Sequence, residues 1–448
     1  MATQVPDQCE SGKQPLKASG AARAQERIES SVRDMQHIHI EPRQHAARAT
    51  ELDVGLRSDH LIDVSQHRCR RTVRHLDGEP WHVGAGTIGV WHLTILCWPR
   101  RGEMTVQHVF VNPAGQDDNL GDSALRAGLL RALDTPGVQL HVHLEAQSSD
   151  YLAGIPLSPR DIFYESRPAW LTASRETVRP IYIVNAGEIN PHPDRPYPLA
   201  GRAAELRSIA DRGGVIIAAG MGLKHPTVAH RVEFDPALRD ASIVSWRDHG
   251  SRDAAGFGDA APDWAFALGT DVSSWIPPTS RTHVAVTLRF DRPWPDTEWF
   301  DAVRAFAERT ETRIVTLAQV ARDAPRAVRL AEELEAEFLM APSTSHDDLD
   351  AHVRAVYATC LAVVSDRAHA LIMGATEGAY PIGTAVDAQK LHRLLDTADV
   401  GTLTGTHDDL ATRTVRLESA LPGLAPAIDS SRQRLDDLTA RIRTVIHG

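Results

Sequence analysis

From Met104 onward, short apolar runs alternate with longer segments in which apolar residues recur at helical spacing. Residues 215–219 and 361–364 are continuous apolar runs, and each is ended by a glycine-containing or polar turn. Such runs are typical of strands buried on both faces, as in parallel sheets. Because helix-like segments follow the runs, the pattern predicts repeated strand–turn–helix units and an α/β fold.

A Pro- and Ser-rich stretch at residues 271–280 interrupts this alternation and is typical of an interdomain linker. We therefore predict an N-terminal domain at residues 104–278 and a C-terminal domain at residues 279–405. Residues 406–448 follow as a helical segment. The face on which we expect it to pack back on the core carries Leu435, Leu438, Ile442 and Val445.

Residues 1–103 lack this order, since no stretch keeps a helical or strand period for long. They hold three of the four Cys and eight His, but at irregular spacings without Cys or carboxylate partners at ligand distances. We therefore predict no metal site there. We expect a poorly patterned extension, either disordered or the result of a start codon assigned too early, that the rest of the chain does not need for folding.

Length and charge limit the classes of function. A chain of 448 residues and 49.0 kDa exceeds what one core usually holds. The formal net charge is −11 and no sustained basic block occurs, which argues against a nucleic-acid partner because phosphate neutralisation needs clustered Lys and Arg. The composition favours small-molecule ligands.

Cysteine usage and hydropathy indicate the compartment. Cys9, Cys69, Cys97 and Cys360 show neither metal-ligand spacing nor a framework of pairs, as expected in a reducing environment. The first twenty residues are polar and do not resemble a signal peptide. The best membrane candidate, residues 83–98, is short, glycine-rich and interrupted by His92. We expect no membrane span and a cytoplasmic location.

The most informative stretch is residues 361–382, where an apolar strand ends in the turn Ser365-Asp366-Arg367-Ala368-His369 and a helix follows. Ligands of open α/β sheets bind at such strand ends, where a helix N-terminus offers free N–H groups to an anion. Arg367 supplies a donor fork for phosphate or carboxylate, and His369 can transfer a proton near neutral pH. The alternative is that both side chains are only solvated or capping residues.

A second turn of this kind lies near the start of the N-terminal domain and reads Asn119-Leu120-Gly121-Asp122. Gly121 allows close approach of a ligand to the backbone, while Asn119 and Asp122 can bond sugar hydroxyls or accept a proton. The alternative is that Asp122 merely caps the following helix.

Three further features lie at predicted strand ends. Gly220 and Gly222 follow a buried strand, but no GxGxxG completes them and we predict no NAD site. Arg289 ends a strand of the second domain and should face the same crevice as Arg367, where two Arg suit a phosphate plus a carboxylate. A pair such as Arg247-Asp248 is as often a structural salt bridge as a ligand contact, and we assign it no catalytic role.

The order of these motifs resembles the polysaccharide pyruvyl transferase family over residues 104–405. The turn SDRAH, the segment GAYPI and the downstream Lys390 match its C-terminal motifs, and NLGD matches its N-terminal one. The chain departs from the family pattern at Ala368, where Leu is usual, and at Trp264, where Pro is usual in a Pro-Asp-Pro-Ala-Phe segment.

The resemblance implies two Rossmann-like domains facing across a cleft, as in B-type glycosyltransferases. It also implies transfer of the enolpyruvyl group of phosphoenolpyruvate onto a sugar diol, forming a pyruvate ketal in cell-surface polysaccharide biosynthesis, without a metal or cofactor. The acceptor would be a sugar or a lipid-linked oligosaccharide. One alternative is a nucleotide-sugar-dependent glycosyltransferase of B-type fold, and another is a non-catalytic relic that only binds ligand.

The resemblance also implies roles for single residues. His369 would be the general acid, Asp122 the base, and Arg367 would act with them on the donor. The residues expected to bind substrate are Arg289, Ser365, Lys390, Asn119, Gly121, Gly220 and Gly222.

Overall fold

A computed structural model describes residues 106–448, which belong to one compact unit. The predicted extension at residues 1–103 and the rejected membrane candidate at residues 83–98 lie outside the described residues. Of the helices in the described part, none has the length and apolar content that a membrane span requires.

The first domain contains an eight-stranded sheet in which every pairing is parallel. Its strands are β1 (Gln107–Val111), β2 (Val138–His143), β3 (Ile162–Tyr164), β4 (Ile181–Val184), β5 (Gly187–Ile189), β6 (Val215–Leu223), β7 (Ile243–Trp246) and β8 (Asp259–Ala260). They lie in the order β3-β2-β1-β4-β6-β7-β8, with β5 paired to β6. The chain order therefore reverses between β1 and β4.

The second domain contains a five-stranded parallel sheet in the order β11-β10-β9-β12-β13. Its strands are β9 (His283–Thr287), β10 (Arg313–Thr316), β11 (Glu337–Phe338), β12 (Cys360–Ser365) and β13 (Tyr380–Gly383). Here the order reverses between β9 and β12, so both sheets have the strand order of a Rossmann-like fold. The predicted fold class, two Rossmann-like α/β domains, is confirmed.

Helices cover both sheets, and this explains the continuous apolar runs in the sequence. All residues of β6 and β12 are buried, as expected for central strands of a parallel sheet. In the first domain the helices are α2 (Leu120–Leu133), α3 (Ser149–Ala153), α4 (Arg167–Glu176), α5 (Ala200–Ala210), α6 (Pro236–Arg239) and α7 (His249–Ala255). In the second they are α8 (Thr297–Arg309), α9 (Ala324–Leu334), α10 (His346–Ala358), α11 (Ala368–Thr376), α12 (Gln389–Asp396) and α13 (Leu410–Thr414).

Single-turn 3-10 helices fill several connections. They are η1 (Pro226–Arg231), η2 (Trp264–Ala267), η3 (Val272–Ser274), η4 (Pro278–Ser280) and η5 (Ala321–Asp323). The predicted linker at residues 271–280 thus contains η3 and η4 rather than an extended strand.

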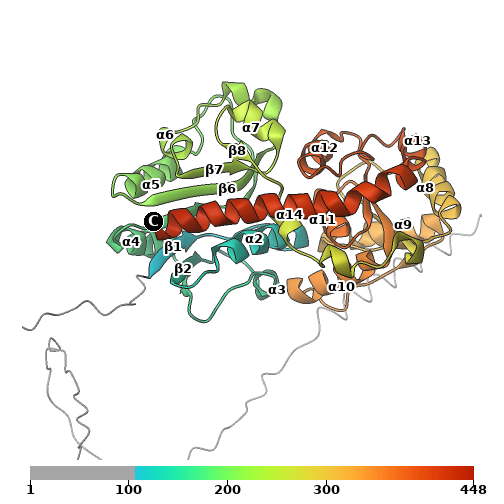
Figure 1. The fold of residues 1–448 in the computed structure, drawn as a ribbon, viewed down its shortest axis with the longest axis horizontal. Coiled ribbons are helices and arrows are strands. Elements are labelled where there is room, and N and C mark those ends of the chain that lie inside the picture. The colour runs from blue at the N-terminus through green and yellow to red at the C-terminus, as the bar shows by residue number, and fades with distance from the viewer. Residues whose placement is uncertain (1–105) are drawn as a thin grey trace, which may run out of the picture. The chain divides into compact units, whose positions relative to one another are not determined.

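The long helix α14 (Leu417–His447) starts beside the second domain and runs back along the first (Figure 1). It packs against β13 and α11 of the second domain and against α2 and β6 of the first. Near its end, Arg179 donates to the carbonyl oxygens of Val445 and Ile446, at 2.8 and 3.0 Å. Its apolar face, predicted from the heptad-like spacing, buries Leu435, Leu438 and Ile442.

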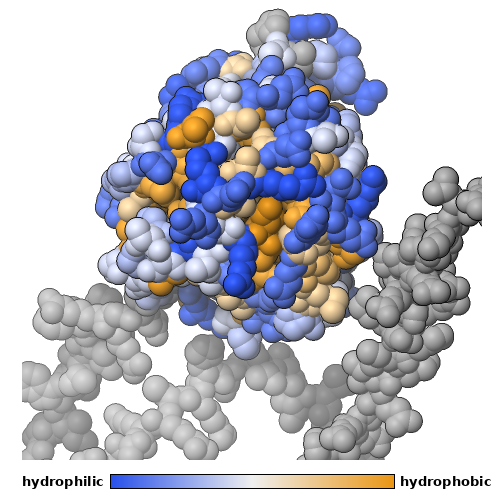
Figure 2. Space-filling model, turned by 90° about the vertical axis from the view of Figure 1, so that its right-hand side faces the viewer, coloured by the Kyte–Doolittle hydropathy of each residue, from blue (hydrophilic) through white to orange (hydrophobic). Residues whose placement is uncertain are grey.

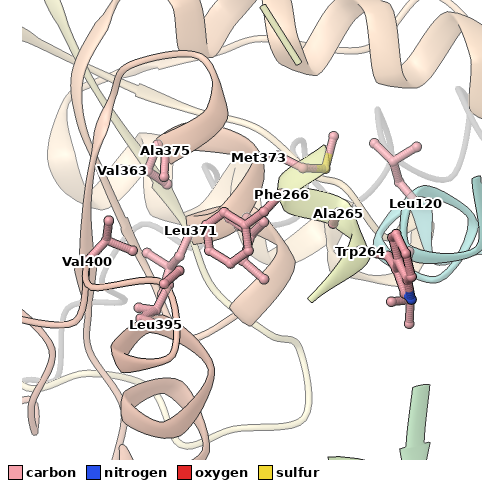
Figure 3. Close-up of a cluster of buried hydrophobic side chains, with 14 of the residues drawn as sticks. Leu120, Trp264, Ala265, Phe266, Val363, Leu371, Met373, Ala375, Leu395 and Val400 are labelled. Carbon is pink, nitrogen blue, oxygen red and sulfur yellow. The ribbon is translucent and has the colours of Figure 1, made fainter. Parts of the chain in front are cut away.

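The turn η2 connects the cores of the two domains because it packs against both α2 and α11. Figure 3 shows Trp264 of η2 beside Leu120 of α2, and Phe266 beside Leu371 of α11. These side chains are fully or almost fully buried. Burying a large apolar side chain contributes about 1.5–3 kcal/mol, so η2 is a major contact between the domains.

The face shown in Figure 2 is mostly polar, with apolar residues visible between the polar ones. Such mixing is ordinary, because apolar atoms form over half of the accessible surface of folded proteins.

Candidate functional site

The candidate site lies where the carboxyl ends of strands from the two sheets meet. The turn between β12 and α11 comes from the second sheet, beside the point where its strand order reverses. The turn between β1 and α2 comes from the corresponding point of the first sheet. Ligands of open α/β sheets bind at such reversals. The structure therefore brings the two turns selected from the sequence to one place.

The N-terminus of α11 has free donors. Arg367 occupies the N-cap position in an extended conformation, and its side chain does not cap the helix. The first intrahelical bond runs from the Leu371 N–H to the Arg367 carbonyl oxygen, at 3.2 Å. The N–H groups of residues 368–370 precede that bond, as at any helix start, and together with the helix dipole they favour an anion.

His369 lies directly against Gly121 of α2. A Cβ atom built on Gly121 would lie 2.3 Å from Nδ1 of His369, a distance that real Cβ atoms do not show. The sequence prediction was that Gly121 makes room for a ligand, but in this structure it makes room for the imidazole. Because Gly121 has no side chain, His369 of the second domain can reach the turn of the first domain that carries Asp122.

This contact predicts the effect of Gly121→Ala. The added methyl group should displace His369 and lower activity by about a hundredfold, because small misplacements at a reacting centre have effects of that size. Ala itself suits a helix better than Gly, so a general loss of helicity is not expected. The measurement is the turnover rate with the donor substrate that is proposed below.

The matched control is Gly201→Ala in α5, where an added Cβ meets nothing within 4 Å. It should leave turnover unchanged. Equal turnover in Gly121→Ala and in wild type would show that the position of His369 does not matter.

On its other side His369 faces Asp263, the N-cap residue of η2. Nε2 of His369 and Oδ2 of Asp263 are 3.5 Å apart, which is a charge contact more than a well-formed hydrogen bond. The Asp263 side chain has no exposed surface. Burial alone would raise the pKa of Asp263, but His369 and then Arg247 hold it at about 2. Asp263 is therefore a buried carboxylate at neutral pH.

A row of alternating charges extends from this pair. Nη1 of Arg247 is 3.4 Å from Asp263, and its Nη2 is 3.9 Å from Oε2 of Glu188. The same Glu188 oxygen is 2.6 Å from Nζ of Lys390, which reaches over from α12. The charges thus alternate across the junction of the domains from Lys390 through Glu188 and Arg247 to Asp263, and the row ends at the His369 imidazole.

The basic residues near this row are close enough to influence one another. Burial and the charge of Arg247 lower the pKa of Lys390, and Arg289 acts in the same direction. Burial alone would raise the pKa of Glu188, whereas Lys390 and Arg247 bring it below its usual value. Lys390, Arg247 and Arg289 therefore form a cationic region that suits an anionic ligand.

Asp122 is held as a carboxylate next to His369. Its Oδ2 accepts the Gln116 N–H at 2.7 Å, and its Oδ1 is 3.3 Å from Arg126. Burial alone would raise the pKa of Asp122, but Arg126, the Gln116 N–H and His369 lower it below its usual value. An ionised carboxylate is the form that a general base requires. The alternative that Asp122 caps α2 is wrong, since the cap is Asn119, whose side chain accepts the Gly121 N–H at 3.1 Å.

The guanidinium of Arg367 is already engaged by a carboxylate. Its Nη2 donates to Oδ1 of Asp323 at 2.8 Å, and its Nε donates to the other oxygen. Asp323 is fully buried and also accepts the Phe290 N–H at 2.9 Å. The carboxylate thus fixes the orientation of Arg367 and uses two of its donor groups. Only Nη1 makes no hydrogen bond within residues 106–448.

Arg289 is likewise paired, here with Asp291, through Nε at 2.9 Å and Nη2 at 2.8 Å. The Arg289 hydrogen bond is the largest cause that lowers the pKa of Asp291 to about 2. Asp366 accepts the Arg289 N–H at 2.8 Å, and burial raises the pKa of Asp366 to about 6. A carboxylate already engages each guanidinium, and substrate contact by Arg289 and Arg367 stays a prediction.

The remaining predicted residues have clear structural partners. Ser365 is fully buried, donates to the Thr287 carbonyl oxygen at 2.7 Å and accepts the Arg367 N–H at 2.9 Å. Its hydroxyl therefore shapes the turn. Substrate contact by Ser365 or Asn119 stays a prediction.

Protein side chains pack against Gly220 and Gly222, so the space that the missing side chains leave is filled by the protein itself. Gly220 has a φ of +95°, and a Cβ on it would lie 2.6 Å from the Trp264 ring. A Cβ on Gly222 would lie 2.4 Å from Nε of Arg247. The two glycines thus allow η2 and Arg247 to reach the site, and a direct contact with substrate stays a prediction.

Sequence reasoning missed three members of the charge row: Arg247, Asp263 and Glu188. The sequence assigned Arg247 and Asp248 no catalytic role, and in the structure the two have different partners, since Asp248 pairs with Arg393 at 2.7 Å. The position of Arg247 directly after the buried strand β7 could have identified it as a residue of the strand-end site. Asp263 could be noticed only as part of the Pro-Asp-Trp-Ala-Phe segment, and nothing in the sequence pointed to Glu188.

In residues 106–448 no group of three or more His, Cys, Asp or Glu is arranged to hold a metal ion. A cavity of about 330 Å³ lies elsewhere, with Arg131, Asp350 and Arg354 in its lining. The domains are in close contact at the site itself.

No protein-family model matches this chain, and no curated protein matches its sequence. Solved structures do match. Anabaena HepE in complex with UDP-glucose is 12% identical with a TM-score of 0.44, and the match covers 75% of this chain and 99% of that one. AviGT4, a glycosyltransferase involved in avilamycin A biosynthesis, is 13% identical with a TM-score of 0.40, covering 76% and 98%.

A third similar structure is the α,α-trehalose 6-phosphate synthase of Burkholderia multivorans, with 11% identity, a TM-score of 0.42 and coverage of 76% and 96%. Similarity at this level concerns the fold alone. The assignment of two Rossmann-like domains therefore rests on the two sheets themselves.

Proposed function

We propose that this chain is a transferase that moves a group from a phosphate-bearing donor to a sugar hydroxyl, and that the donor is phosphoenolpyruvate. The observation that carries the proposal is the meeting of three separate motifs at His369. The NLGD turn contributes Gly121, the SDRAH turn contributes His369, and the PDWAF segment contributes Asp263. Segments so distant in sequence meet at one imidazole beside a helix N-terminus, which supports a joint chemical role.

The arrangement suits addition of a hydroxyl to an enol carbon. That reaction needs a proton at the methylene carbon and removal of a proton from the attacking hydroxyl. His369 is placed to supply the first, and the ionised Asp122 is placed to accept the second. The phosphate and the carboxylate of phosphoenolpyruvate would be bound by the N–H groups at the start of α11, by Lys390 and by Nη1 of Arg367.

A nucleotide sugar is the second candidate donor. The start of α11 follows the fourth strand of a Rossmann-like sheet, and free N–H groups there suit a diphosphate as well as a single phosphate. The similar structures described above are named as enzymes or complexes of sugar donors, but their TM-scores are too low to decide between the two donors. In this reading Asp122 or His369 would be the base that activates the acceptor.

The test compares the two donors directly. The protein is incubated with phosphoenolpyruvate or with UDP-glucose and a panel of pyranosides, while release of phosphate or UDP is measured. Thermal unfolding with each donor is recorded in parallel, since a ligand at a hundred times its dissociation constant adds about 2.7 kcal/mol of stability. We expect stabilisation and phosphate release with phosphoenolpyruvate.

The other outcomes are equally informative. UDP release and stabilisation by UDP-glucose would replace the first candidate by the second. Stabilisation without turnover across the panel would support a protein that binds the donor and does not transfer it.

A further inference from the structure

Asp263 has an unusual environment for a buried carboxylate. Its Oδ1 accepts the Ala265 N–H at 3.0 Å and so caps η2. Its Oδ2 faces nitrogen atoms of two side chains, with Nε2 of His369 at 3.5 Å and Nη1 of Arg247 at 3.4 Å. One oxygen therefore serves the backbone, and the other is shared between an imidazole and a guanidinium.

The two nitrogens of His369 have different surroundings. Nε2 is buried, lies 3.5 Å from Oδ2 of Asp263 and makes no shorter polar contact within residues 106–448, while Nδ1 is the atom nearest to the position of the missing Gly121 Cβ. The charged groups that act on the ring are Asp263 from η2 and Asp122 from α2, and Arg247 from the end of β7 contacts Asp263. A carboxylate at one nitrogen fixes the tautomer and thereby determines which nitrogen exchanges a proton with substrate.

We propose that Asp263 is the positioning residue of His369: it holds the Nε2–H and leaves Nδ1, on the Gly121 side, to exchange the proton. Arg247 supports this arrangement because it stabilises the Asp263 carboxylate in the absence of solvent. The role of Nδ1 as the proton donor in catalysis rests on the proposed function. The orientation of the His369 ring does not, because it is independent of the donor.

In the proposed reaction the proton leaves Nδ1 of the imidazolium. The electron pair of the donor's C2–C3 double bond forms the new C3–H bond, and the first acceptor oxygen bonds to C2 while its proton passes to Asp122. The phosphate is still bonded to C2 in this adduct; it leaves when the second acceptor oxygen bonds to C2, and it takes the proton of that hydroxyl. His369 is left neutral with its remaining proton on Nε2, where Asp263 accepts it. Asp263 stays ionised throughout, which matches a role in orientation and charge stabilisation.

The first experiment uses the wild-type protein and needs no substrate. Histidine is labelled with ¹⁵N, and the His369 signals are assigned by comparison with His369→Gln. We expect the neutral ring to carry its proton on Nε2. A neutral ring protonated on Nδ1 would overturn the proposal.

The second experiment removes the charge of Asp263. Asp263→Asn keeps an oxygen that can accept the Ala265 N–H, so the cap and the packing are retained. The fraction of the neutral His369 ring that carries its proton on Nε2 should fall clearly, because the charge that selects this tautomer is gone. Turnover should fall with it, while the Michaelis constant stays close to the wild-type value.

The matched control is Asp248→Asn. Asp248 is also buried and caps α7, and it pairs with Arg393 at 2.7 Å without contacting His369. This variant should leave the His369 tautomer unchanged even if it lowers stability. An unchanged tautomer in Asp263→Asn would refute the positioning role. Failure of the wild-type protein to use phosphoenolpyruvate would instead refute the proposed function, and the tautomer result would still stand.

Discussion

Replacing His369 by Gln is expected to lower turnover by about a hundred- to ten-thousand-fold while weakening donor binding far less. General acid catalysis usually contributes a factor of this size. Gln can still donate a hydrogen bond to phosphate, but it cannot supply a proton. Steady-state kinetics separates the two roles, because loss of an interaction made only in the transition state lowers turnover and leaves the Michaelis constant nearly unchanged.

The control is His192→Gln, since His192 is mostly exposed and its ion-pair partner within residues 106–448 is Asp194. It should retain wild-type turnover. A higher Michaelis constant with persistent turnover in His369→Gln would make His369 a ligand contact and place the acid elsewhere.

Replacing Asp323 by Ala is expected to lower the free energy of unfolding by about 3–5 kcal/mol, the usual cost of removing one partner of a buried ion pair. Asp323 is fully buried, and its loss leaves the Arg367 guanidinium and the Phe290 N–H without acceptors. Urea unfolding followed by tryptophan fluorescence measures the change, with donor binding recorded on the same samples.

Asp291→Ala provides the comparison, because Asp291 pairs with Arg289 in the same geometry but 39% of its side-chain surface is exposed. Exposed pairs are worth about 0–1 kcal/mol, so this variant should remain close to wild type. Similar losses in both variants would mean that burial does not determine the strength of these pairs.

The pattern of apolar positions was sufficient to predict much of the fold. The continuous runs at residues 215–219 and 361–364 became the buried central strands β6 and β12. The runs are informative because a strand covered on both faces must be apolar at every position, and that requirement is local. The two glycine-containing or polar turns that follow strands were also found at the carboxyl edges where they were expected.

The partners of charged side chains could not be predicted in the same way. Arg247 stands next to Asp248 in the sequence, yet it faces Asp263 and Glu188, while Asp248 pairs with Arg393 of the other domain. Adjacent residues of an extended backbone point in opposite directions, so proximity in sequence says little about ion pairing.

The sequence alone thus determined the α/β class, the division into two α/β halves and the turns that carry His369 and Asp122, because these follow from local periodicity and turn composition. Only the tertiary structure decided that His369 packs against Gly121 and that Nε2 of His369 faces Asp263. It also decided that Asp323 pairs with the guanidinium of Arg367. Each of these contacts joins segments far apart in the chain. Their geometry depends on how the two domains pack around η2, and no local pattern encodes that packing.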